Sequence, residues 1–182
     1  MQTEVATARD AGLVANLVNA AYRGAGGRLG WTHEAELIAG DRTSATVVAG
    51  MLGDDATTVL IRRDDKSRKL LGCIAVEMNG TDQCTISMLA VDPDTQRGRL
   101  GRALLEDAER FGASKGAKIA TMTVVRQRDS LIAWYERRGY RRTGALEAFP
   151  YGDDSVGQPR REDLSFVVLE KALQLAGSSL QM

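Results

Sequence analysis

Apolar residues along the chain follow two different spacings. They recur every three or four positions across residues 11–23 and 100–111, which is the spacing of a helix with one buried face. Short apolar and β-branched runs between turn residues predict strands. These runs span residues 4–8, 57–62, 70–78, 84–91, 118–125, 140–144 and 164–170. The pattern predicts a chain in which helices and strands are interleaved.

The segments between these runs predict further helices and loops. One helix is expected to begin with Thr32 as its N-cap, and two others to cover residues 44–52 and 130–138. The glycine-rich residues 24–31 cannot form regular structure. The loop at residues 147–163 is long enough to suggest a function.

Length and charge narrow the class of protein. The 182 residues contain no repeat or linker, so we expect one domain, residues 1–182, with an α/β fold: a mixed sheet with helices on both faces. Lys+Arg and Asp+Glu both number 24, and a net charge of zero argues against nucleic acid or an acidic membrane as partner. No apolar run approaches a membrane span of about 18 residues, and the N-terminus has no leader pattern, so a cytoplasmic protein is expected.

The stretch V-D-P-D-T-Q-R-G-R-L-G-R-A-L-L, residues 91–105, joins a strand to a helix. A helix start leaves backbone N–H groups unpaired and carries a partial positive charge, which together form an anion site. Arg97, Arg99 and Arg102 add cations to the same turn. The turn therefore predicts a ligand that carries phosphate, although neither the P-loop pattern nor G-x-G-x-x-G is present.

This turn resembles motif A of the GNAT superfamily of N-acetyltransferases, which reads Q/R-x-x-G-x-G/A after a V-x-P turn. Gln96 occupies the first position and Gly101 the last, while Arg99 stands at the middle glycine. A second motif follows in R-D-S-L-I-A-W-Y-E-R-R-G-Y, where Tyr135 is followed after three residues by Gly139 and an aromatic residue. This matches the family pattern Y-x-x-x-G-F/Y. The resemblance covers about residues 57 to 171.

The resemblance implies the acyl-CoA N-acyltransferase fold, with acetyl-CoA as acyl donor. The donor's pyrophosphate is expected on the N–H groups of the turn. The strand before the turn is expected to bend, as at a β-bulge, and to splay from its neighbour, which presents backbone groups of Leu89 and Val91 to the pantetheine arm. The implied donor-binding residues are Leu89, Ala90, Val91, Gln96, Arg97, Gly98, Arg99, Leu100, Gly101 and Arg102.

The resemblance also implies catalytic roles. Tyr135 is the expected proton donor to the departing sulfur, and the alternative is that it is only a core aromatic. Glu77 is the candidate base, acting through water, because the strand at 84–91 contains no carboxylate. The alternative for Glu77 is a solvated residue at a strand end. The peptide N–H of Leu89 would stabilise the oxyanion.

The acceptor pocket is expected from the first helices and the late loop. Tyr22, Arg23, Trp31 and Tyr151 are the candidate substrate-binding residues. Arg23 suits a substrate with a carboxylate, although a solvated arginine at a helix end is the common alternative.

We therefore expect an N-acetyltransferase that moves an acetyl group from acetyl-CoA to a primary amine on a small molecule, an amino acid or a protein terminus. Cys73 and Cys84 have neither metal-ligand spacing nor an activating context and are expected to be buried thiols, so direct attack in a ternary complex is predicted. An acyl-CoA-binding sensor without turnover is the main alternative. RNA binding through the arginines is a weaker one, because no aromatics are interleaved for stacking. Homodimers are common in the family.

Overall fold

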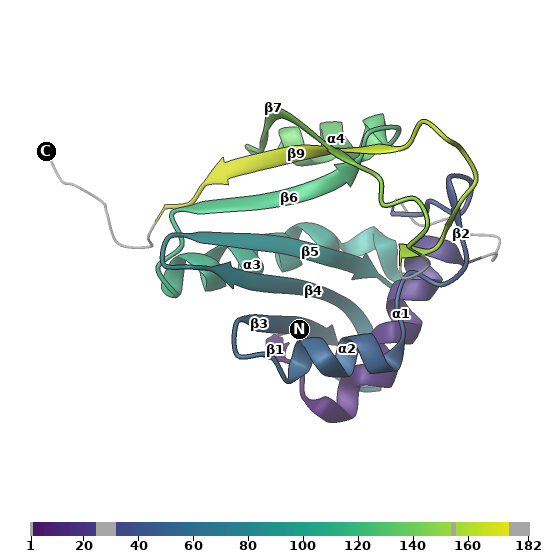
Figure 1. Cartoon of the computed structure of the whole chain (residues 1–182). Helices are drawn as coiled ribbons and strands as arrows, with labels where there is room; N and C mark the ends of the chain where they lie inside the picture. The colour runs from purple at the N-terminus through teal and green to yellow at the C-terminus, as the bar shows by residue number, and fades with distance from the viewer. Residues whose placement is uncertain (1, 25–31, 154–155, 175–182) are drawn as a thin grey trace, which may run out of the picture.

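A seven-stranded sheet runs through the centre of the structure (Figure 1). The computed structural model describes residues 2–24, 32–153 and 156–174. The strands of this sheet are β1 (Thr3–Val5), β3 (Thr57–Arg63), β4 (Leu70–Asn79), β5 (Gln83–Val91), β6 (Ile119–Val125), β7 (Arg141–Ala148) and β9 (Ser165–Ala172). Their order is β1-β3-β4-β5-β6-β9-β7, and all neighbours are antiparallel except β5 and β6. The prediction of a mixed sheet is confirmed.

Helices cover both faces of the sheet, as the sequence predicts (Figure 1). The helices are α1 (Ala11–Arg23) and α2 (Ala45–Leu52) on one face, and α3 (Leu100–Ser114) and α4 (Asp129–Glu136) on the other. One buried cluster includes Val18 of α1 and Val48 of α2. A second buried cluster includes Leu104 of α3 and Ile132 of α4. None of the described helices is long and apolar enough to cross a membrane.

The prediction of a helix after Thr32 is wrong. Residues 32–37 form turns and lead into β2 (Ile38–Ala39), which pairs with β8 (Gln158–Pro159) in a separate small sheet. Thr32 does not cap a helix, because it is buried and its hydroxyl donates to the carbonyl oxygen of Ala21 at 3.3 Å. Contacts with α1 therefore override the local helix signal.

Glycine at position 72 lets α3 lie close to the sheet. A Cβ atom there would come within 2.6 Å of Leu104 Cδ1 and within 3.1 Å of the Ala90 carbonyl oxygen. Leu100 and Leu104 are almost fully buried at this contact. The start of α3 is thus fixed against the sheet, directly after the short helix η2 (Pro93–Gly98) that forms the predicted turn.

The strand β5 carries a bulge where it approaches this turn. Its register with β4 shifts between Ser87 and Ala90, so that Met88 and Leu89 face a single β4 residue. Met88 has a φ of 55°, in the left-handed region. A bulge bends a strand and increases its twist. The predicted bend before the turn is confirmed.

The strands β5 and β6 are parallel but pair along only part of their length. Register partners join residues 83–85 of β5 to residues 119–121 of β6. Beyond these residues the two described strands continue without register partners in each other, and their carboxyl ends diverge (Figure 1). The predicted splay is therefore confirmed.

The strand β7 forms one outer edge of the sheet and β1 the other. All eight residues of β7 are exposed. The register of β7 with β9 shifts between Arg142 and Leu146, which interrupts the pairing along the strand.

Candidate active site

A cavity of about 270 Å³ opens where β5 and β6 diverge, and we call it the splay cavity. Its walls come from the end of α1, the segment 22–42 where described, β5, β6 and α4, and from Phe149, Val156 and Phe166. In open sheets with helices on both faces, ligands commonly bind beyond the carboxyl ends of parallel strands. The elements that carry the predicted motifs therefore meet at the splay cavity.

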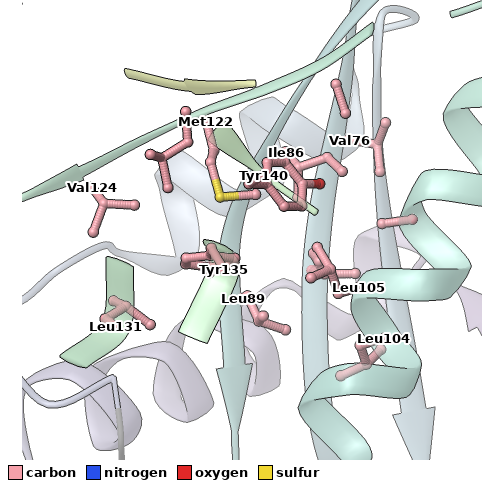
Figure 2. Close-up of a cluster of buried hydrophobic side chains, with 14 of the residues drawn as sticks. Val76, Ile86, Leu89, Leu104, Leu105, Met122, Val124, Leu131, Tyr135 and Tyr140 are labelled. Atoms are coloured by element: carbon pink, nitrogen blue, oxygen red, sulfur yellow. The ribbon is translucent and has the colours of Figure 1, made fainter. Parts of the chain in front are cut away.

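Tyr135 of α4 lies in the wall of the splay cavity. Its side chain is 6% exposed and packs edge-on against Trp134 and Tyr140, in one cluster with Leu89 and Leu131 (Figure 2). Among the residues that the structure describes, none forms a hydrogen bond with its hydroxyl. Burial raises the pKa of Tyr135 well above the ordinary value of a phenol, so the group keeps its proton at neutral pH. A protonated phenol in this position is chemically able to donate to a ligand in the cavity.

Tyr22 links α1 to the bulge of β5. Its hydroxyl donates to the carbonyl oxygen of Leu89 at 3.1 Å. Burial raises the pKa of Tyr22, and Arg42 opposes that effect, so the hydroxyl remains a donor at neutral pH. The hydrogen bond holds the bulged backbone from the side of α1.

A second hollow of about 260 Å³ lies at the turn between β5 and α3, and we call it the turn hollow. It is lined by Val91, Arg99, Leu100, Gly101, Arg102, Trp134 and Arg138. The first backbone bond of α3 runs from the N–H of Ala103 to the carbonyl of Arg99, and no side chain caps the helix. The three amides before Ala103 therefore have no helical acceptor. Free amides and arginine side chains together make an anion-binding environment.

The backbone conformation of Arg99 explains why the middle position of the motif favours glycine. It is the N-cap of α3 and has a φ of 57° and a ψ of 15°, which is the left-handed conformation. For a residue with a Cβ atom this conformation costs about 1 to 2 kcal/mol, because the Cβ crowds the following carbonyl oxygen. Although arginine replaces glycine at this position, the turn keeps the left-handed conformation, which glycine would adopt at a lower cost.

Three arginines and one glutamate line the splay cavity, and we call Arg23, Arg42 and Arg128 the arginine wall. Glu34 lies 3.1 Å from Arg23 Nη2 and 3.7 Å from Arg128 Nη1. It is the only carboxylate among the described residues that line the cavity. Burial lowers the pKa of Arg23 and Arg128, and Glu34 opposes that effect, so both guanidinium groups stay charged.

Arg23 is not a solvated arginine at a helix end. Its Nη1 donates to the carbonyl oxygen of Ile38 at 2.7 Å and its Nη2 to that of Val156 at 3.4 Å. The Nε of Arg23 is buried and has no hydrogen-bond partner among the described residues. Arg128 Nη1 donates to the carbonyl oxygen of Thr32 at 3.0 Å. These contacts fix both arginines at the cavity.

The structure does not place Tyr151 at the splay cavity, and its role in substrate binding stays a prediction. Tyr151 is 45% exposed and does not line the splay cavity. Its hydroxyl donates to the carbonyl oxygen of Arg161 at 3.0 Å and accepts from the N–H of Leu164 at 2.7 Å. The Tyr151 hydroxyl therefore bonds to the backbone of the loop in which Tyr151 lies. Phe149, two residues earlier, lines the cavity instead.

The other predicted site residues lie in different parts of the structure. Tyr22 and Arg23 line the cavity. Glu77 is exposed on β4 and is not among the residues that line the cavity, and its role as a base acting through water stays a prediction. Trp31 lies outside the described residues. The donor-binding roles predicted for the remaining residues of η2, which are Gln96, Arg97 and Gly98, stay predictions.

Sequence reasoning missed Arg42. Its guanidinium lies 5.8 Å from the centre of the Tyr22 ring, and its backbone N–H donates to Asn19 Oδ1 at 2.8 Å. The residue stands in D-R-T, which matches no motif. Only the packing of the segment after β2 against α1 brings it to the cavity, so no local signal marked it.

Cys73 and Cys84 are free, buried thiols, as predicted. Burial raises the pKa of Cys73 to about 12 and that of Cys84 to about 11. Neither therefore forms a thiolate at neutral pH, and neither lines the splay cavity.

The geometry defines a class of protein. A bulged strand that splays from a parallel neighbour, a cavity in the gap and an uncapped helix start beside it are what the resemblance implies for an acyl-CoA-dependent acyltransferase. The model of the acetyltransferase (GNAT) family matches residues 31–140, which is more than half of the chain. The chain belongs to this family and is an acyl-CoA-dependent N-acetyltransferase.

Solved structures of acetyltransferases share this fold. The ribosomal-protein-alanine N-acetyltransferase from Brucella melitensis is 15% identical, with a TM-score of 0.66 and coverage of 95% of this chain and 100% of that one. The spermidine N-acetyltransferase from Vibrio cholerae is 11% identical, with a TM-score of 0.65 and coverage of 94% and 95%. A GNAT family acetyltransferase from Elizabethkingia anophelis with acetyl-CoA bound is 15% identical, with a TM-score of 0.57 and coverage of 71% and 84%. No curated protein matches this chain at a significant level.

Proposed function

We propose that this protein transfers an acetyl group from acetyl-CoA directly to a primary amine within a ternary complex. The observation that carries the proposal is the hydroxyl of Tyr135. It belongs to a residue in the wall of the splay cavity, it is protonated at neutral pH, and no described residue forms a hydrogen bond with it. A group in that state is suited to protonate a leaving sulfur.

The two hollows fit the two ends of the donor. The turn hollow offers the free amides of α3 to the pyrophosphate, together with the guanidinium groups of Arg99 and Arg138. On β5, Leu89 lines the splay cavity and Val91 the turn hollow. The pantetheine arm would therefore run along the edge of β5 that β6 leaves unpaired, as an added strand does.

Acetyl transfer forms a C–N bond and breaks the C–S bond of the thioester. The N–H of Leu89 lies in the bulge, outside the regular register with β4, and would stabilise the oxyanion of the tetrahedral intermediate. Tyr135 would give its proton to the departing sulfur. The attacking amine releases its proton to solvent, from which Tyr135 is reprotonated, so the protons balance.

The amine itself loses a proton without help from a free carboxylate. Among the described lining residues, Glu34 is the only acid, and Arg23 and Arg128 engage it. We therefore infer that the acceptor reacts as the neutral amine drawn from solution. The raised pKa values of the two thiols argue against an acetylated cysteine as intermediate.

Initial rates of thiol release at varied acetyl-CoA and amine concentrations test the direct route. Direct transfer gives intersecting double-reciprocal lines and no increase in protein mass when acetyl-CoA is present alone. Parallel lines together with an acetylated protein would contradict the proposal.

Thermal unfolding tests donor binding separately. A ligand at 100 times its Kd stabilises the folded state by about 2.7 kcal/mol, so acetyl-CoA should raise the unfolding midpoint and ATP should not. Stabilisation by acetyl-CoA without thiol release for any amine would instead indicate an acyl-CoA-binding module.

A further inference from the structure

The arginine wall carries more charge than Glu34 neutralises. Three guanidinium groups and one carboxylate line the splay cavity among the described residues. Arginine does not lose its proton in proteins, so the three positive charges persist over the whole working pH range. Among the described lining residues, positive charge is therefore in excess beside the bulge where transfer is proposed.

The acyl donor does not account for this excess. The pantetheine arm and the thioester are neutral, and the phosphates of the donor are assigned to the turn hollow, whose arginines are different residues. The excess charge of the splay cavity is thus left for the acceptor.

Arg42 is the member of the arginine wall whose guanidinium is available to bind a ligand. Arg23 and Arg128 are engaged by Glu34 and by backbone carbonyls. The guanidinium of Arg42 packs over the ring of Tyr22, and no described carboxylate or carbonyl pairs with it. A planar guanidinium is the preferred partner of a carboxylate, because it donates two parallel hydrogen bonds.

The lining of the cavity also has an apolar part. It includes Ile38, Phe149, Val156 and Phe166. Ile38 and Phe149 belong to one buried cluster, against which Val156 and Phe166 pack. An acceptor that fits this cavity therefore combines an anionic group with an apolar body.

We propose that the acceptor is a small amine that carries a carboxylate and an apolar body, in the class of an apolar amino acid, and that Arg42 binds its carboxylate. This inference rests on the proposed function. Tyr22 spans from Arg42 to the carbonyl of Leu89, so a carboxylate at Arg42 leaves the rest of a small acceptor beside the bulge. A polyamine is disfavoured, because its charges would meet the excess positive charge of the wall.

Matched pairs of acceptors test the proposal by thiol release. Each pair is an amino acid and the amine that remains when its carboxylate is removed: phenylalanine with phenethylamine, tryptophan with tryptamine, and leucine with isoamylamine. Spermidine serves as the polycationic acceptor. We expect the carboxylate member of at least one pair to have a kcat/KM roughly 10- to 100-fold higher, which corresponds to hydrogen bonds to a charged group.

Variants of Arg42 assign the preference to this residue. Arg42→Gln should lower kcat/KM for the amino acid by roughly 10- to 100-fold and change the rate of its decarboxylated partner far less. Arg42→Glu should reverse the preference within the pair. Arg9→Gln removes an exposed arginine that is not at the cavity and should retain the wild-type preference. Equal losses for both members of a pair in Arg42→Gln would overturn the proposal, as would a wild-type preference for the decarboxylated amines.

A binding measurement separates this inference from the proposed function. Calorimetric titrations in the presence of free CoA compare N-acetylphenylalanine with its amide, and need no turnover. Preferential binding of the acid, lost in Arg42→Gln, supports the carboxylate site even if no amine releases thiol. Equal or absent binding of the acid and the amide overturns it, whatever the rates of acetyl transfer.

Discussion

The turn hollow and the arginine wall are built in different ways. Most of the turn hollow comes from one continuous stretch, residues 91–102, and its main chemical groups are backbone amides at the start of α3. The arginine wall and Glu34 come from four separate places between positions 23 and 128, and they act through side-chain charge. A site made of backbone tolerates changes of side chain, whereas a site made of paired charges does not.

The largest effect is expected at Tyr135, between the two regions. Tyr135→Phe should lower kcat by roughly 10²- to 10⁴-fold, because it removes the proton donor to the leaving sulfur. The stabilisation of the protein by acetyl-CoA should remain. Steady-state rates and thermal unfolding with acetyl-CoA measure the two quantities.

Tyr140→Phe is the matched control for this prediction. Tyr140 is also a buried tyrosine, but it does not line the splay cavity, and its hydroxyl has no hydrogen-bond partner among the described residues. Removing such a hydroxyl is expected to leave kcat unchanged and stability unchanged or slightly higher. Equal losses of kcat in both variants would refute the assignment of Tyr135.

The arginine wall should respond strongly to the loss of its carboxylate. Glu34→Gln removes the carboxylate that pairs with the buried guanidinium group of Arg23 at 3.1 Å, so the free energy of unfolding should fall by about 3 kcal/mol. Chemical denaturation measures this change. The exposed Glu77→Gln should stay within about 0.5 kcal/mol of the wild type and keep its activity. A large loss of activity in Glu77→Gln would instead support Glu77 as the base.

The pH profile should reflect the acceptor rather than a carboxylate base. Because the acceptor reacts as the neutral amine, kcat/KM should rise about tenfold per pH unit below the amine's own pKa. Burial raises the pKa of Tyr135, so its phenol keeps the proton. We therefore expect no decrease in rate as the pH rises to about 10, the ordinary pKa of a phenol. Rates between pH 6 and pH 10 test this. A plateau beginning near pH 6, or a decline before pH 10, would indicate a protein base or a different acid.

The smallest effect is expected at the turn hollow. Arg99→Gly relieves a left-handed residue with a Cβ and should raise the free energy of unfolding by about 1 kcal/mol. Binding of acetyl-CoA should persist, because the backbone amides remain. Arg102→Gly, in the first turn of α3, should have the opposite sign, since glycine costs about 1 kcal/mol in a helix. Denaturation curves of both variants decide whether the backbone conformation or the side chain matters at position 99.

The sequence was sufficient to predict the parts of the fold and site that depend on residues close together in the chain. The apolar spacing predicted α1 and α3, the β-branched runs predicted β3 to β6, and the turn between β5 and α3 predicted a helix start with unpaired backbone amides. Each of these depends on residues close together in the chain. The bulge and the splay followed from the resemblance, and backbone register confirms both.

Local reasoning failed where contacts distant in sequence decide. Thr32 and the residues after it have the composition of a helix start, but the hydrogen bond from Thr32 to α1 keeps this segment as turns. Arg42 has no motif and reaches the cavity only through packing on Tyr22. Tyr151 and Phe149 are two residues apart in one aromatic loop, and only the hydrogen bonds of the Tyr151 hydroxyl decide which of them faces the cavity.

The two edges of the central sheet bear on how the protein behaves when crowded. An outer strand with unpaired amides is a template on which another chain can add a strand and begin aggregation. β1 offers only three residues, and β7 begins with Arg141 and Arg142 and has an interrupted register. The short length of β1, and the charges and interrupted register of β7, oppose edge-to-edge growth. Both edges therefore disfavour amyloid-like stacking.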